Sequence, residues 1–167
     1  MWVTFFLGLL CVAICQWITY HLYCRIANNS GIENANEAAL LGILVSSPLI
    51  YFTIRGGDYN HNAMQLWSIA AMYYFYYRTW EQERFENIAP HFGWWAGLGL
   101  MTGFAVISKY SVLIQITVLI THFIFASRWR SMRAWQGIGI AMIVGLVIAS
   151  PHLIWLYDQT LRGQGPI

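Results

Sequence analysis

Six long apolar stretches, separated by short polar segments, constrain this chain more than any other feature of its sequence. They cover residues 2–23, 38–54, 63–77, 92–107, 110–126 and 135–155. A helix that crosses a bilayer needs roughly 20 apolar residues, within a range of about 17–25. Only 10% of the 167 residues are charged, whereas soluble domains carry about a quarter. We therefore predict an all-α, polytopic transmembrane helical bundle with about six spans.

The positive charges fall into alternate polar segments, and this indicates an orientation. Six arginines follow the first, third and fifth stretches: Arg25, Arg78, Arg84, Arg128, Arg130 and Arg133. The other segments hold Arg55, Lys109 and Arg162. Because positively charged loops face the cytoplasm, we expect the first set inside and the second set outside. The net charge of +2 is too small and dispersed to indicate nucleic acid as a partner.

The predicted inner side carries acidic residues among its arginines. These acidic residues are Glu33, Glu37, Glu81, Glu83 and Glu86. We interpret this mixture of signs as an ordinary solvated surface.

The same orientation places Met1 on the outer side with no signal sequence before it. We therefore expect residues 1–167 to be a single transmembrane domain that is an internal piece of a larger protein. A first span, a first outer loop and a C-terminal part would then be missing.

Glycines recur at short intervals in the fourth apolar stretch. Gly93 and Gly97, and then Gly99 and Gly103, give two overlapping GxxxG spacings. Small residues at this interval let helix backbones approach closely. We expect that approach to occur inside one bundle rather than between two copies of the chain.

Polar side chains of an unusual kind gather in the predicted outer segments. They are Asp58, Asn60, His61, Asn62, Lys109 and His152. Each has a structural alternative: Asp58 or Asn60 could cap a helix, Lys109 could reach the headgroups, and His152 could be a packing residue. Together they favour a site, because ionisable groups at membrane depth are costly and tend to face cavities or partners.

The chemistry of these residues suits an amphipathic substrate. The cationic Lys109 beside apolar walls suits a phosphate attached to a lipid tail. The amides and the imidazole of Asn60, His61 and Asn62 suit sugar hydroxyls. A metal site would need a third ligand besides Asp58 and His61, so we predict no metal and no cofactor, with a divalent cation left open.

Four segments in succession carry a family resemblance. They read DYNHNAMQLW at 58–67, WAGLGLMTG at 95–103, SKY at 108–110 and SPHLIWL at 150–156. Their order and placement resemble bacterial members of the dolichyl-phosphate-mannose protein mannosyltransferase superfamily, which are glycosyltransferase family 39-like. The resemblance lies nearest the branch with lipopolysaccharide-core galacturonosyltransferases and the lipid A aminoarabinose transferase. It covers nearly the whole chain, to Asp158.

The resemblance implies a GT-C fold and a membrane glycosyltransferase. Such an enzyme takes a sugar from a polyprenyl-phosphate carrier and gives it to a lipid, glycan or protein acceptor, on the outer face of the bacterial cytoplasmic membrane. The family's catalytic acidic residue lies in the first outer loop, which would precede Met1. No catalytic residue is therefore assigned, and we expect the chain alone to be inactive.

The resemblance also suggests roles for the outer residues. Lys109 would bind the carrier phosphate, Asp58, Asn60, His61 and Asn62 would position donor or acceptor, and His152 would support them. Two alternatives stay open. A transporter module for a lipid-linked substrate would need a matching polar cluster on the inner side, and the sequence offers none. A non-catalytic membrane subunit remains an alternative because the first outer loop is missing.

Overall fold

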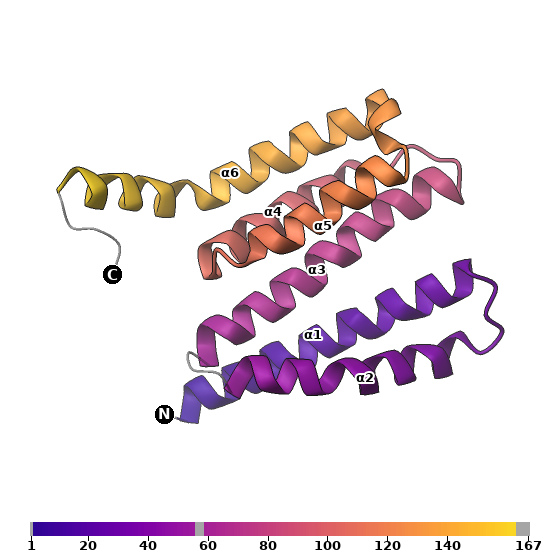
Figure 1. Ribbon diagram of the computed structural model, residues 1–167, viewed down its shortest axis with the longest axis horizontal. Coiled ribbons are helices and arrows are strands. Elements are labelled where there is room, and N and C mark those ends of the chain that lie inside the picture. The colour runs from indigo at the N-terminus through magenta and orange to yellow at the C-terminus, as the bar shows by residue number, and fades with distance from the viewer. Residues whose placement is uncertain (1, 56–58, 163–167) are drawn as a thin grey trace.

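A computed structural model describes the backbone of residues 2–55 and 59–162, and the side chains of residues 6, 8–46 and 64–162. All regular structure in these residues is helical (Figure 1). The elements are α1 (Trp2–Asn29), α2 (Ala35–Arg55), α3 (Tyr59–Arg84), α4 (Phe92–Ser108), α5 (Val112–Phe125), the short 3-10 helix η1 (Arg128–Arg130) and α6 (Met132–Leu161). The predicted all-α bundle is confirmed.

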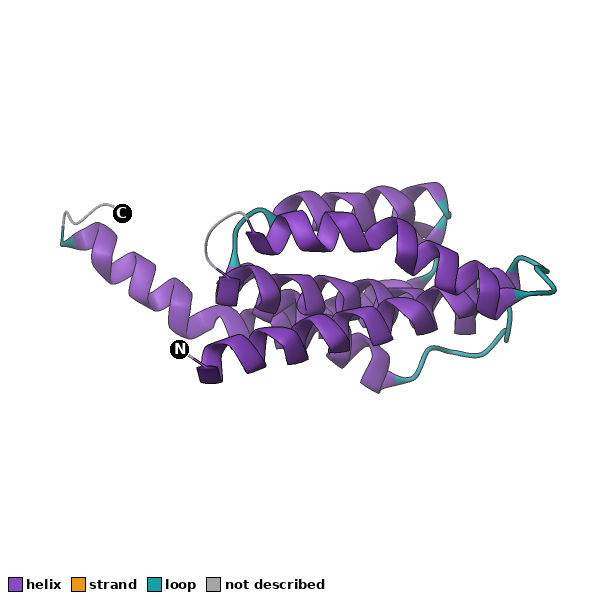
Figure 2. Cartoon of the chain, turned by 90° about the horizontal axis from the view of Figure 1, so that it is seen from below, coloured by secondary structure: helices purple, strands orange, loops and turns teal. Residues whose placement is uncertain are grey.

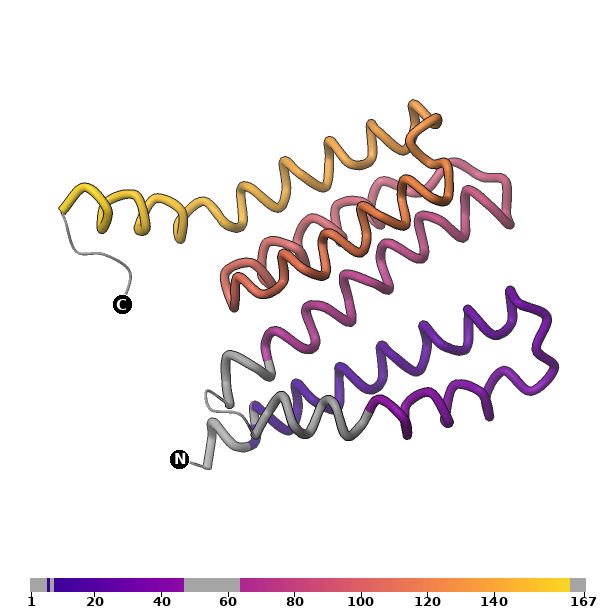
Figure 3. Tube along the Cα trace, viewed as in Figure 1, coloured from indigo at the N-terminus to yellow at the C-terminus, as the bar shows by residue number. Residues whose placement is uncertain are grey.

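The chain passes back and forth between two ends of the bundle (Figure 3). The main helix contacts join α2 to α1, α1 to α3, α3 to α4 and α4 to α6, while α5 packs more lightly on α3 and α4. The last turns of α6 extend beyond the other helices (Figure 2). This part of α6 therefore has few neighbours within the described chain.

Helix α3 is longer than the apolar stretch that predicts it. The prediction stops at residue 77, but the helix continues to Arg84. The added turns carry Arg78 and Glu81, which pair with each other and remain largely buried. Charged side chains with partners do not need to leave the bundle, so the helix continues past the apolar stretch.

The core lies between α3 and α4, and a second close contact joins α4 to α6. Met72, Trp95 and Ala105 belong to the main buried cluster. At Gly99, a Cβ atom would lie 2.3 Å from the carbonyl oxygen of Ala141 on α6. The expectation that the α4 glycines serve packing within one bundle is confirmed for Gly97, Gly99 and Gly103, which lie against neighbouring helices, but not for Gly93.

The outward-facing surface is apolar, as a bilayer requires. Val45 is 76% exposed and Phe125 is 84% exposed. By length and composition, Gly8–Asn29 and Met132–Leu161 can each cross a membrane. Three further apolar helices are shorter, over Ala35–Ser46, Phe92–Ser108 and Val112–Phe125. The protein is a helical bundle of the membrane type, because so much exposed apolar surface would be costly in water.

Candidate substrate site

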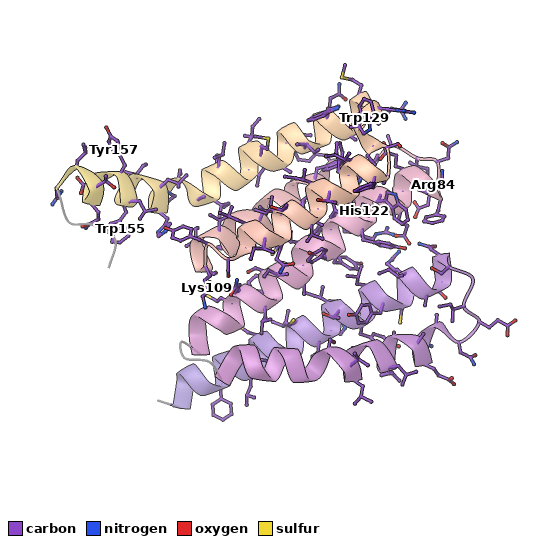
Figure 4. All side chains as sticks on the ribbon, in the orientation of Figure 1. Arg84, Lys109, His122, Trp129, Trp155 and Tyr157 are labelled. Carbon is purple, nitrogen blue, oxygen red and sulfur yellow. The ribbon has the colours of Figure 1, made fainter. Side chains whose placement is uncertain are left out.

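The two ends of the bundle separate the charged residues as the sequence predicts. Figure 4 shows Lys109 at one end, with Arg84, His122 and Trp129 toward the other. We call these the Lys109 end and the arginine end.

Four of the six predicted site residues have side chains that the structure does not describe. Asp58 lies outside the described residues, and Asn60, His61 and Asn62 lie in the first turn of α3 with only their backbone described. Among the described side chains, no group of three or more His, Cys, Asp or Glu is placed to hold a metal ion. The predicted binding residues that can be followed in atomic detail are therefore Lys109 and His152.

Lys109 stands at the turn between α4 and α5. Its backbone is extended, with φ −168° and ψ 131°, and its N–H closes α4 on the Ala105 carbonyl at 3.1 Å. The turn is tied to α3, because Gln65 Nε2 donates to Ser111 Oγ at 2.7 Å. Gln65 is buried, so this bond fixes the turn against the first turns of α3.

His152 lies against the same turn. A hydrogen bond of 2.8 Å joins its Nε2 to the hydroxyl of Tyr110. On its other side, the imidazole stacks on Trp155 with ring centroids 5.7 Å apart. The α4–α5 turn and the end of α6, about 40 residues apart in sequence, thus meet at the Lys109 end.

A proline positions His152. Pro151 lies inside α6 and has no N–H to give to the carbonyl four residues earlier. That carbonyl belongs to Val147, and it accepts a bond of 2.8 Å from Ser150 Oγ instead. The helix therefore continues to Leu161 and carries His152 and Trp155 past the end of α4.

An apolar groove leads away from this cluster. It lies between α5 and α6 with α4 as its floor, and its volume is about 600 Å³. One face of α6 lines it from Trp135 to Leu153, a length of about 27 Å at 1.5 Å per residue. This length approaches the roughly 30 Å hydrocarbon thickness of a bilayer. Leu153 places one end of the groove directly beside His152.

Aromatic rings close the opposite end of the groove. Phe123 and Trp135 meet edge to face with centroids 5.5 Å apart, and Tyr76 and Trp95 also contribute to the wall. Behind them lies the guanidinium of Arg128, 5.3 Å from the centroids of both the Tyr76 and Trp95 rings. A hydrocarbon chain in the groove would meet these rings rather than the charge.

Arg128 is the main residue that the sequence interpretation missed. It is only 4% exposed, and its Nε and Nη2 atoms both lie 2.9 Å from Glu83 Oε2. Thr79 Oγ1 accepts from Nη1 at 3.2 Å, and Ser131 Oγ donates to the second Glu83 oxygen at 2.8 Å. The buried cation is thus neutralised by two residues of α3, and Ser131, just before α6, supports the Glu83 carboxylate.

A second buried network ties α1 to α3 at the arginine end. Glu81, 5% exposed, accepts from Arg25 at 2.9 Å and from Asn29 at 2.8 Å, and also pairs with Arg78. The expectation of an ordinary solvated surface is therefore wrong for Glu81 and Arg128. Both residues are buried because oppositely charged and polar side chains on neighbouring helices bind them.

The comparisons with known proteins agree with the resemblance in the sequence. A family model described as dolichyl-phosphate-mannose-protein mannosyltransferase matches residues 1–155. The lipopolysaccharide core galacturonosyltransferase RgtA of Rhizobium johnstonii is 28% identical over 143 residues. The match covers 86% of this chain but 27% of RgtA, so the chain spans about a quarter of that relative's length. No solved structure is significantly similar to the chain.

Proposed function

Because the chain belongs to the dolichyl-phosphate-mannose-protein mannosyltransferase family, we propose that it is part of a membrane glycosyltransferase. The protein takes a sugar from a polyprenyl-phosphate-linked donor and gives it to a lipid, glycan or protein acceptor. It crosses the bacterial cytoplasmic membrane several times, and the Lys109 end faces outward. The observation that carries this proposal is the apolar groove between α5 and α6, which ends beside the Lys109 turn.

The groove supports a lipid-linked donor through its shape and its position. Its walls come mainly from side chains of α4, α5 and α6, and it extends over most of a bilayer's hydrocarbon thickness. Lipid tails are as apolar as these walls, so burial in the groove adds little hydrophobic driving force. The groove orients the tail, and the polar end must supply the selectivity.

Lys109 supplies the charge that a phosphodiester needs. A cation next to the phosphate balances its negative charge, and near the membrane this interaction is stronger than in bulk water. During transfer, the acceptor oxygen bonds to the anomeric carbon while the bond from that carbon to the phosphate oxygen breaks. The electron pair leaves with the polyprenyl phosphate, and a carboxylate takes the hydroxyl proton. Lys109 stabilises the growing charge on the leaving phosphate.

The name of RgtA indicates which substrates to test first. It describes transfer of galacturonate to a lipopolysaccharide core. We therefore propose to test a galacturonosyl donor with a lipopolysaccharide core acceptor first, and a mannosyl donor with a protein acceptor second.

The test compares two cations at the same end of the bundle. The protein is expressed from its native locus, and transfer of radiolabelled sugar from the polyprenyl-phosphate pool is measured in membranes. Lys109→Ala should lower transfer by at least about tenfold. Arg162→Ala, which removes an exposed cation paired with Asp158, should leave transfer unchanged.

Protein abundance in the membrane is measured in parallel for both variants. Full transfer by Lys109→Ala at normal abundance would contradict the proposal and assign Lys109 to headgroup contact. Equal loss in both variants would also contradict it, because charge at this end would then matter without any specific site.

A further inference from the structure

We propose that the rings of Tyr110, His152 and Trp155 form a stacking surface for the sugar ring of the lipid-linked donor. We call these three residues the ring row. The inference rests on the proposed function, because it takes the carrier phosphate to be held at Lys109. It adds the recognition of the sugar, which the groove and Lys109 do not explain.

In the ring row, His152 stacks on Trp155, and Tyr110 is tilted against the other face of the row. Tyr110 and His152 have centroids 6.0 Å apart and an interplanar angle of 35°. His152 and Trp155 have centroids 5.7 Å apart and an angle of 21°. Tyr110 is 50% exposed and Trp155 is 52% exposed, so both end rings offer aromatic surface to a ligand.

The row is held in place before any ligand arrives. The hydrogen bond between the Tyr110 hydroxyl and His152 Nε2 fixes the imidazole. The turn that carries Tyr110 is fixed in turn by Gln65 through Ser111. A surface that is already ordered loses little conformational freedom on binding.

A sugar ring fits this surface better than a lipid tail does. One face of a pyranose presents C–H groups, which pack on aromatic rings, while its edge presents hydroxyls. The ring row offers both kinds of partner, since the Tyr110 hydroxyl can form a second hydrogen bond besides the one to His152 Nε2, and the other imidazole nitrogen, Nδ1, is a further polar group of the row. The tail already has the groove, whose last α6 residue is Leu153.

The position of the row matches the covalent structure of the donor. In a polyprenyl-phosphate sugar, the sugar is attached directly to the phosphate, so it must lie next to the group that binds the phosphate. Tyr110 is the residue after Lys109. Lys109 and the ring row are therefore neighbours at the end of the groove, as the phosphate and the sugar are neighbours at the end of the lipid tail.

An interfacial tryptophan that only anchors the helix is the competing explanation, and Tyr157 provides the matched control. Tyr157 is an exposed aromatic residue of the same helix segment, and it points to the opposite side of α6 from Trp155 (Figure 4). An anchoring role predicts similar effects for both residues. A stacking role predicts an effect for Trp155 alone.

The experiment measures binding to the full chain in nanodiscs with three probes. These are undecaprenyl phosphate, undecaprenyl-phosphate mannose and undecaprenyl-phosphate galacturonate. We expect at least one sugar-linked probe to bind the wild type more tightly than undecaprenyl phosphate does. Trp155→Ala should weaken binding of that probe by about three- to tenfold and leave undecaprenyl phosphate binding unchanged. Tyr157→Ala should change neither.

Three outcomes would overturn the inference. Stacking tolerates many pyranoses, so a wild type that binds neither sugar-linked probe more tightly than undecaprenyl phosphate has no sugar surface here. Equal weakening of all probes by Trp155→Ala would make Trp155 a lipid contact. An unchanged affinity in Trp155→Ala would remove it from the site. Lys109→Ala tests the proposed function separately, because it should weaken all three probes.

Discussion

Replacing Gly99 by alanine tests the packing that brings α4 against α6. The new Cβ atom would lie 2.3 Å from the Ala141 carbonyl oxygen and 2.9 Å from two further backbone atoms of that residue. These are backbone atoms, so no side chain can rotate away. The two helices must move apart by about 1 Å before the contact becomes ordinary.

The expected cost follows from two opposing effects. Overpacking of a well-packed contact costs about 1–3 kcal/mol. Alanine regains up to about 1 kcal/mol over glycine within a helix. Because the clash is with backbone atoms, the overpacking cost is at the upper end of that range, and we expect Gly99→Ala to lower the free energy of unfolding by roughly 2 kcal/mol. Because α4 is the floor of the groove and α6 one wall, the same separation should also weaken undecaprenyl phosphate binding.

Gly139 is the matched control on α6. A Cβ atom there would meet nothing within 4 Å, so Gly139→Ala should leave stability unchanged or raise it by up to about 1 kcal/mol. Unfolding is followed by circular dichroism as SDS is added to the purified protein in mixed micelles. The reasoning fails if Gly99→Ala is as stable as the wild type, or if Gly139→Ala loses as much stability.

Two further predictions concern the polar contacts that join the helices. Arg128→Ala leaves Glu83 without its cation and should lower the free energy of unfolding by about 3 kcal/mol in the same titration. Arg130 is exposed, so Arg130→Ala should change it by no more than about 0.5 kcal/mol. Equal effects of the two substitutions would mean that the Arg128–Glu83 pair does not stabilise the fold. Gln65→Leu removes the bond to Ser111 and should weaken undecaprenyl phosphate binding a few-fold, at a cost of about 1 kcal/mol in stability. Unchanged binding in that variant would show that Gln65 does not set the Lys109 turn.

Helix positions could be predicted where charged or polar residues mark the ends of an apolar stretch. The predicted span 110–126 corresponds to α5 at Val112–Phe125, and 92–107 corresponds to α4 at Phe92–Ser108. The end of α3 could not be predicted in this way. Its last two turns carry charges whose partners, such as Arg25, lie about 50 residues away in sequence, and hydropathy along one segment does not detect them.

The site could be predicted in part. Alternation of charges places Lys109 and His152 at the same end, and the structure joins their segments through Tyr110. The contacts of Tyr110 and Trp155 with His152 depend on how the α4–α5 turn packs against α6, which sequence spacing does not give. The signal for Arg128 was present as an opposite charge, Glu83, at the same predicted end. Counting charges does not reveal that Arg128 is buried against Glu83.

The central claim is that a polyprenyl phosphate occupies the groove between α5 and α6, and site-specific photocrosslinking tests it most directly. A photoreactive amino acid is placed at Leu146, which lines the groove, or at Val147, the next residue, which is 64% exposed and outside the groove lining. Each protein is illuminated in membranes with radiolabelled undecaprenyl phosphate. We predict strong labelling from position 146, which excess unlabelled lipid abolishes. From position 147 we predict only background labelling, which excess unlabelled lipid does not change. Equal labelling from the two positions would mean that the lipid samples the whole surface of α6 and would contradict the account.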